Sequence, residues 1–198
     1  MRIAVSGTHC CGKSSLVEEF LLNHPDFAHE PEPYIVLEED YGEVFGAEPS
    51  LDDFNRQLEF NVERLQSYDS GERVICERSP VDFLAYMLAL NDLRRCEGAT
   101  RLIESSVGIV TAAISLLDLI AFLPLDENED TAGMLSDAED PELRKAVDTR
   151  LNGIFLDNDF DLFRSRHPIV LELRGSTAQR LRTLDEFFGR EPAEAKAG

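Results

Sequence analysis

A short glycine-containing loop between an apolar stretch and a helix restricts most strongly how this chain can fold. Residues 2–6 are apolar enough for a buried strand, and residues 13–23 carry apolar side chains at helical spacing. Between them, GTHCCGKS at residues 7–14 matches the pattern G-x-x-x-x-G-K-[ST]. Glycines let successive backbone amides converge on one point, where the amino end of the helix adds positive charge. The loop is therefore predicted to cradle phosphate groups.

Each position of this phosphate loop has an expected role in holding a nucleotide. Lys13 should reach the β and γ phosphates of ATP, and the hydroxyl of Ser14 should contact Mg²⁺. The other loop residues are expected to bind ATP mainly through their backbone amides: Gly7, Thr8, His9, Cys10, Cys11, Gly12 and Ser15. Three consecutive side chains cannot easily surround one tetrahedral metal, which argues against a metal site at His9, Cys10 and Cys11. A redox role for the two thiols stays open.

Apolar segments alternate with helical patterns along the rest of the chain. Strands are expected at 27–30, 73–77, 119–125 and 169–174, and helices at 51–68, 80–90, 100–117, 141–156 and 176–188. This alternation predicts an α/β fold in which helices cover both faces of a five-stranded parallel sheet. Ligands of such sheets bind at the carboxyl ends of the strands. We expect a single domain over residues 1–190, with a lid-like loop at 126–140 and a flexible tail at 191–198.

Composition restricts the partners and the compartment. A net charge of −20 opposes binding to nucleic acid and to anionic lipid. The four cysteines form no paired zinc motif and fit no disulfide framework, which suggests a reducing, cytoplasmic setting. The apolar segment 107–125 is interrupted by Asp118 and Pro124, so a buried helix followed by a buried strand explains it better than a membrane span. The apolar helix at 102–117 could serve either the core or a homodimer face.

A second motif, VICERSP at residues 74–80, places two charged residues at the end of an apolar strand. Glu77 and Arg78 are expected to lie beside the phosphate loop. A carboxylate there can hold Mg²⁺ directly or through water. Glu77 is therefore a metal-binding candidate, as is Ser14, and a catalytic candidate, as is Lys13. A guanidinium there can neutralise charge on a transferring phosphoryl group, which makes Arg78 a candidate for catalysis and for substrate binding.

GTHCCGKSSL and ERSPVDFLAYML together resemble a branch of the P-loop NTPase superfamily. This branch holds the deoxynucleoside kinases and the nicotinamide riboside kinase-like proteins, many of them described only as AAA-type ATP-binding domain proteins. The resemblance implies a three-layer P-loop NTPase fold. It also implies a kinase that transfers the γ-phosphoryl group of ATP, with Mg²⁺, to a hydroxyl of a small nucleoside-like molecule. The expected ligands are thus ATP and a small-molecule acceptor.

The resemblance also implies roles for residues outside the two motifs. In these kinases a glutamate followed by proline ends the second strand and acts as the general base. In HEPEPY, residues 29–34, both Glu30 and Glu32 fit, and Glu30 is favoured because it directly ends the apolar stretch. Gln57 matches the glutamine that reads the acceptor base.

The lid is where the chain departs from the kinase pattern. Such kinases bring arginines from a mobile segment onto the phosphates, and residues 126–140 contain none. Arg144 and Arg150, on the following helix, are the nearest substitutes, and Arg144 is taken as a substrate-binding candidate. This departure keeps an alternative open, in which the chain is an NTPase or a nucleotide-dependent regulatory protein without a small-molecule acceptor.

Overall fold

The computed structural model describes residues 1–46, 48–125, 140–163 and 168–189 of the chain. Five parallel strands form one sheet in the order β2-β3-β1-β4-β5. They are β1 (Arg2–Ser6), β2 (Ala28–Glu30), β3 (Val74–Glu77), β4 (Leu119–Phe122) and β5 (Ile169–Glu172). The prediction of a five-stranded parallel α/β sheet is confirmed. Because β1 lies between β3 and β4, the loop after β1 leaves the sheet at the point where the strand order reverses.

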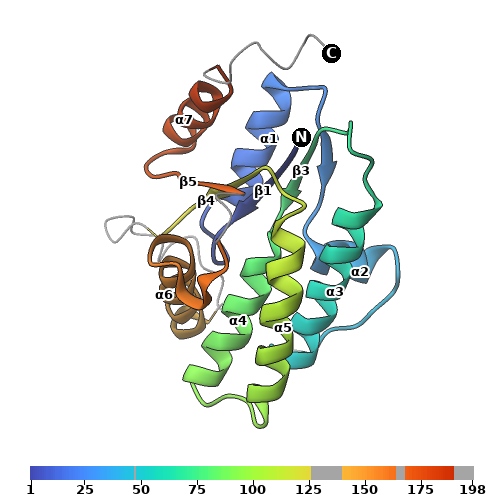
Figure 1. Cartoon of the computed structure of the whole chain (residues 1–198), viewed down its shortest axis with the longest axis vertical. Helices are drawn as coiled ribbons and strands as arrows, with labels where there is room; N and C mark the ends of the chain where they lie inside the picture. The colour runs from blue at the N-terminus through green and yellow to red at the C-terminus, as the bar shows by residue number, and fades with distance from the viewer. Residues whose placement is uncertain (47, 126–139, 164–167, 190–198) are drawn as a thin grey trace.

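Helices cover both faces of this sheet, as Figure 1 shows. They are α1 (Lys13–Asn23), α2 (Pro33–Glu39), α3 (Leu51–Ser67), α4 (Pro80–Asp92), α5 (Ala99–Ile114), α6 (Pro141–Leu156) and α7 (Thr177–Gly189), with a 3₁₀ turn at Asp159–Asp161. One face of the sheet presents residues such as Ile3 and Val5 to α1 and α7. The other face presents residues such as Ala4 and Phe122 to α3, α4, α5 and α6. This alternation is expected for strands that are buried on both sides.

Helix α4 lies at the centre of the larger layer and begins directly after β3. Every residue from Pro80 to Leu90 is buried, so the helix has no solvated face over this length. Pro80 occupies the first turn, and Ser79 and Asp82 form a reciprocal capping box that satisfies amides at the helix start. These local signals fix the start of α4 at Pro80.

One helix, α2, was not predicted. Pro31 and Pro33 were expected only to end the second strand, but Pro33 starts α2, where a missing N–H costs nothing. The strands β4 and β5 also end earlier than expected, at Phe122 and Glu172.

Two further predictions concern segments for which the structure gives little or nothing. The tail at 191–198 lies outside the described residues, as does the loop at 126–140 apart from Asp140, the N-cap of α6. The boundaries of the single domain stay a prediction. Among the helices in the described ranges, none combines the length and the apolar character needed to cross a membrane.

Candidate functional site

The phosphate loop wraps around the amino end of α1 at the carboxyl edge of the sheet. Gly12 has a φ of 87°, a left-handed conformation that favours glycine. A Cβ at Gly7 would lie 2.6 Å from the Cys11 Sγ and 2.7 Å from the Leu123 carbonyl oxygen, so no larger residue fits there. The Lys13 Nζ donates to the Thr8 carbonyl oxygen at 2.7 Å, across the loop. The predicted lysine is thus buried within the loop whose amides it would complement.

Two arginines from the carboxyl-terminal helices hold the outside of this loop. Arg144 of α6 donates to the carbonyl oxygens of His9 and Cys10 at 3.0 and 3.1 Å. Arg180 of α7 donates to the Cys11 carbonyl oxygen at 2.8 Å. Both are almost completely buried. The structure therefore places Arg144 against the backbone of the loop, and it adds Arg180, which sequence reasoning missed.

Glu77 and Ser14 meet as the two motifs predict. The Ser14 hydroxyl donates to one carboxylate oxygen of Glu77 at 2.6 Å, and the His29 Nε2 lies 2.9 Å from the other oxygen. In the described residues no group of three His, Cys, Asp or Glu side chains forms a protein-only metal cage. A hydroxyl and one carboxylate beside a phosphate loop suit Mg²⁺, which keeps several waters and takes ligands from bound phosphates. These two residues therefore fit the predicted metal.

Arg78 lies directly after β3 and connects the phosphate loop to a neighbouring cavity. Its φ of 85° is unusual for a side chain of this size and turns the guanidinium back under the loop. The guanidinium donates to the Gly7 carbonyl oxygen at 2.8 Å and pairs closely with the carboxylate of Glu32. Asp82 lies 3.5 Å away on the next turn. Burial alone would lower the pKa of Arg78. The carboxylates of Glu32 and Asp82 nevertheless raise it well above its ordinary value.

The cavity beside Arg78, called here the Gln57 cavity, has a volume of about 280 Å³. It is lined by Glu32, Tyr34, Phe45, Gly46, Pro49, Asp53, Phe54, Gln57, Arg78, Phe83 and Tyr86. Five of these residues are aromatic, so most of the wall is apolar and flat. Gln57 is 6% exposed, and no hydrogen bond joins its amide to another described residue. The amide is therefore a polar group of this wall that is available to a ligand.

The carboxylate of Glu32 lies at the start of α2, on the wall of this cavity. Burial alone would raise its pKa, but the positive charges of Arg78 and Lys13 and a hydrogen bond from Arg78 outweigh it. The pKa of Glu32 therefore lies below its ordinary value, and the side chain is a carboxylate at neutral pH.

Glu30, the carboxylate that sequence reasoning favoured, does not line the Gln57 cavity. It is the last residue of β2 and is buried against α3, where Arg64 donates to both of its oxygens at 3.0 and 2.8 Å. The hydroxyl of Tyr68 also bonds to it closely. Its hydrogen-bonding capacity is thus taken up by Arg64 and Tyr68. The two glutamates of HEPEPY differ because Glu30 still belongs to a strand, whereas Glu32 directly precedes the helix α2.

Two residues that contact the phosphate loop escaped prediction because they lie within the apolar pattern of α4. Asp82 is completely buried and accepts from the Ser6 hydroxyl at 2.7 Å and from the Gly7 amide at 2.9 Å. Tyr86 places its hydroxyl 3.1 Å from the His9 backbone nitrogen. The acidic residue three positions after a serine signals the capping box, but nothing in the sequence indicates that either side chain reaches the phosphate loop.

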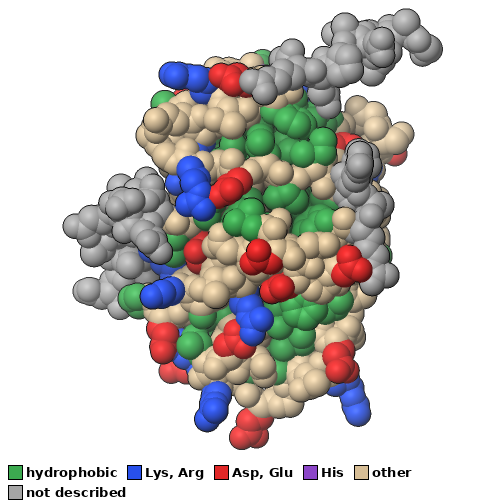
Figure 2. Space-filling view, turned by 60° about the vertical axis from the view of Figure 1, so that its left-hand side comes forward, with side chains coloured by type: hydrophobic (Ala, Val, Ile, Leu, Met, Phe, Trp, Pro, Cys, Tyr) green, Lys and Arg blue, Asp and Glu red, His purple; other side chains and the backbone are tan. Residues whose placement is uncertain are grey.

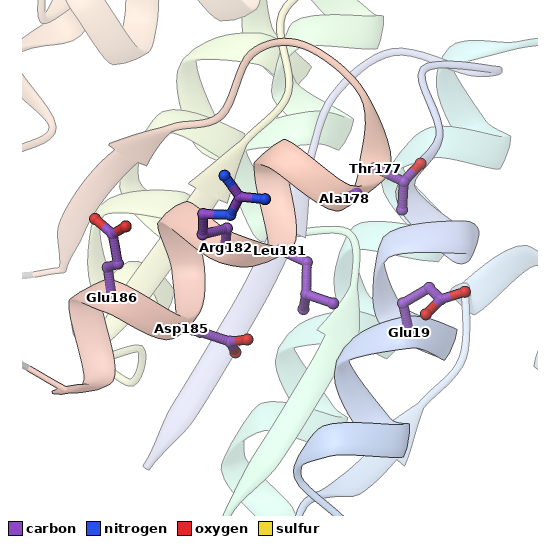
Figure 3. Close-up of a pocket in the computed structure, with 7 residues that line it drawn as sticks. All are labelled: Glu19, Thr177, Ala178, Leu181, Arg182, Asp185 and Glu186. Atoms are coloured by element: carbon purple, nitrogen blue, oxygen red, sulfur yellow. The ribbon is translucent and has the colours of Figure 1, made fainter.

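A second hollow lies between α1 and α7, and Figure 3 shows its lining. Its residues are Glu19, Thr177, Ala178, Leu181, Arg182, Asp185 and Glu186. It contains none of the predicted site residues, and its carboxylates would repel a phosphate group. The Gln57 cavity and the phosphate loop therefore make up the candidate site.

Comparisons with known proteins support this assignment of the fold. The model of the AAA domain family matches residues 2–180. Among solved structures, deoxyadenosine kinase from M. mycoides with bound dATP is similar at 15% identity and a TM-score of 0.66, over 96% of this chain and 100% of that chain. Thymidylate kinase from Candida albicans is similar at 16% identity and a TM-score of 0.65, over 95% and 90% of the two chains.

A third similar structure is larger than this chain. NadR protein in complex with NR matches at 15% identity and a TM-score of 0.61, over 96% of this chain and 52% of that one, so the present chain spans about half its length. Among curated proteins, no relative matches the sequence. The structural likenesses show a kinase-like P-loop NTPase fold, as the two sequence motifs predicted. With a family model that matches nearly its whole length, this chain belongs to the AAA domain family.

Proposed function

We propose that this protein is an ATP-dependent kinase that transfers the γ-phosphoryl group of ATP to a hydroxyl of a small nucleoside-like molecule. The observation that carries the proposal is the Glu32–Arg78 pair, which lies between the phosphate loop and the Gln57 cavity. A protein that only hydrolysed a nucleotide would need no second cavity beside the phosphates. For this reason the kinase is favoured over an NTPase or a regulatory protein without an acceptor.

Glu32 is the proposed general base. A base must be deprotonated and must reach the hydroxyl proton, and the lowered pKa and the position of Glu32 in the cavity wall meet both conditions. In the reaction, the acceptor oxygen forms a bond to the γ phosphorus, the bond to the bridging oxygen of ADP breaks, and the hydroxyl proton passes to Glu32. Glu30 is not favoured for this role, because Arg64 and Tyr68 occupy its carboxylate.

The positive groups around the loop supply the electrostatic part of the proposal. Lys13 and Arg78 are both buried and bonded to carbonyl oxygens of the loop, and they would complement the charge on the transferring phosphoryl group. Ser14 and Glu77 would hold Mg²⁺, which neutralises phosphate charge when it is bound. Arg144 and Arg180 keep the loop in shape by donating hydrogen bonds to its carbonyl oxygens. In this proposal Arg144 therefore supports the loop instead of binding the substrate.

The Gln57 cavity supports a planar acceptor. Aromatic side chains can stack on a base ring, and the Gln57 amide can both donate to and accept from its edge. Deoxyadenosine kinase and thymidylate kinase share the fold, which is consistent with an acceptor of this kind.

The proposal is tested by a screen of acceptors. Purified protein is mixed with ATP, Mg²⁺ and single ribonucleosides, deoxyribonucleosides or nicotinamide riboside, and phosphorylated products are identified by mass spectrometry. We expect product from at least one acceptor with the wild type and none with Lys13→Ala. If ATP binds but ADP forms at the same rate with and without every acceptor, the chain is an NTPase instead.

A further inference from the structure

Tyr86 contacts both halves of the candidate site. Its ring lines the Gln57 cavity and stacks on Phe54, with the ring centroids 4.6 Å apart. Its hydroxyl oxygen accepts the His9 backbone N–H at 3.1 Å and lies 3.1 Å from Nδ1 of the same histidine. The Cζ of Arg78 lies 5.3 Å from the centroid of the ring. One side chain thus joins a wall of the cavity, the phosphate loop and the arginine between them.

The hydroxyl group distinguishes Tyr86 from the apolar side chains of α4. Tyr86 is 5% exposed and lies among apolar side chains, where a phenylalanine would fill nearly the same volume. A phenylalanine, however, would remove this acceptor from the half-buried His9 amide, and the loss of such a hydrogen bond destabilises the conformation that forms it. Because Tyr86 accepts the His9 N–H, this amide serves the shape of the phosphate loop here rather than direct contact with ATP, whereas the ring contributes to the shape of the cavity.

On the basis of the proposed function, we infer that Tyr86 is a positioning residue that couples the packing of the Gln57 cavity to the nucleotide affinity of the phosphate loop. The ring and the hydroxyl are rigidly connected, so any contact that holds the ring in place also holds the hydroxyl oxygen that accepts the His9 N–H. An acceptor that stacks against this wall would thereby favour the loop conformation that binds ATP. Because coupling between two binding sites is reciprocal, bound ATP would favour binding of the acceptor by the same factor.

A double-mutant cycle tests this coupling with the nucleotide alone as the ligand. The dissociation constant of AMP-PNP with Mg²⁺ is measured by calorimetry for four full-length proteins: the wild type, Phe54→Leu, Tyr86→Phe and the double variant. Tyr86→Phe should weaken binding roughly two- to tenfold, the range of one lost hydrogen bond. Phe54→Leu loosens the stack on Tyr86 and should weaken binding at least about twofold, but it should have no further effect once the hydroxyl is gone.

Tyr34→Phe is the matched control. Tyr34 also lines the cavity, but its hydroxyl lies near Glu38, which raises the pKa of Tyr34, and it makes no hydrogen bond to a described residue of the phosphate loop. In the Tyr34→Phe background, Phe54→Leu should still weaken AMP-PNP binding by the same factor as in the wild type. Melting curves check that each variant is folded, and Phe54→Met replaces Phe54→Leu if the latter is not.

The outcomes separate the coupling from the proposed function. Effects of Phe54→Leu and Tyr86→Phe that simply multiply would overturn the coupling while leaving nucleotide binding intact. An unchanged affinity in Tyr86→Phe would overturn it as well. If the wild type itself does not bind AMP-PNP, the proposed kinase fails and the coupling fails with it.

Discussion

At the scale of single residues, the two glutamates of HEPEPY lie only two positions apart in the sequence but occupy different environments. Glu30 belongs to β2 and is held by Arg64 and Tyr68, whereas Glu32 directly precedes α2 and pairs with Arg78 at the Gln57 cavity. The sequence offers both as a general base, because each is followed by proline. Which one faces the cavity depends on where the strand ends, and strand ends are set by tertiary packing rather than by local propensity.

Exchanging each carboxylate for an amide distinguishes the two residues. Glu32→Gln should lower the rate of phosphoryl transfer about 10²- to 10⁴-fold, because the base is lost while the nucleotide site remains. Glu30→Gln should retain transfer but lower the free energy of unfolding by about 1–2 kcal/mol, since the bonds from the half-exposed Arg64 are weakened. Steady-state kinetics and denaturant unfolding measure the two effects, and reversed results would assign the base to Glu30.

The pH dependence of the reaction follows from the environment of Glu32. Because its pKa lies below the ordinary value of 4.5, the base stays deprotonated above that pH. The ion pair with Arg78 likewise contributes stability that is present above the pKa of the unfolded state and is lost as the pH falls through the lowered pKa. A profile of kcat/KM against pH should therefore show no acid limb from this residue until below pH 4.5. An acid limb near neutrality that disappears in Glu32→Gln would contradict this ionisation.

At the scale of elements, most of the α/β pattern was predictable because the buried strands are short continuous apolar runs and the amphipathic helices repeat apolar residues at helical spacing. Predicted and observed bounds coincide for α1 and α6. The helix α2 was missed because two prolines that end a strand can equally begin a helix. The contacts of the loop with α6 and α7 were not predictable, since Arg180 lies 169 positions from Cys11. No local pattern reports which arginine of a helix will be buried against a distant backbone.

The hydrogen bond from Arg180 of α7 to the phosphate loop gives a prediction for that helix. Arg180→Met should weaken binding of ATP with Mg²⁺ about 10-fold, because the buried Cys11 carbonyl oxygen loses a charged donor. Arg182→Met, an equal change of charge two residues along the same helix, affects an exposed side chain on the wall of the hollow in Figure 3 and should leave the affinity unchanged. Calorimetric titration of both variants measures the difference. Equal losses would mean that only the total charge of α7 matters.

At the scale of the whole molecule, the strongly acidic chain concentrates its buried positive charge at one place. In the part of the chain that the structure describes, the buried basic residues are Lys13, Arg78, Arg144 and Arg180, and each bonds to the backbone of the phosphate loop. On the face shown in Figure 2, the exposed basic side chains are instead scattered among acidic ones. A polyphosphate would therefore find concentrated positive charge at the loop, despite the net charge of −20.

Nucleotide binding should consequently stabilise the whole chain. At about 100 times the dissociation constant, ATP with Mg²⁺ should raise the melting temperature of the wild type by about 5–10 °C. Lys13→Ala should lose most of this shift, because the ammonium group nearest to the loop is removed. A wild-type melting temperature that does not respond to saturating ATP would remove the basis for every nucleotide-dependent function of this site.

The central claim is that the γ-phosphoryl group of ATP is passed to an acceptor held in the Gln57 cavity. The most direct measurement follows the label from [γ-³²P]ATP in wild-type and Glu32→Gln protein, each with the acceptor panel and Mg²⁺. We expect the wild type to place the label on an acceptor, and Glu32→Gln to bind ATP equally well without labelling it. Label that is released only as inorganic phosphate, at equal rates in both proteins, would contradict the claim.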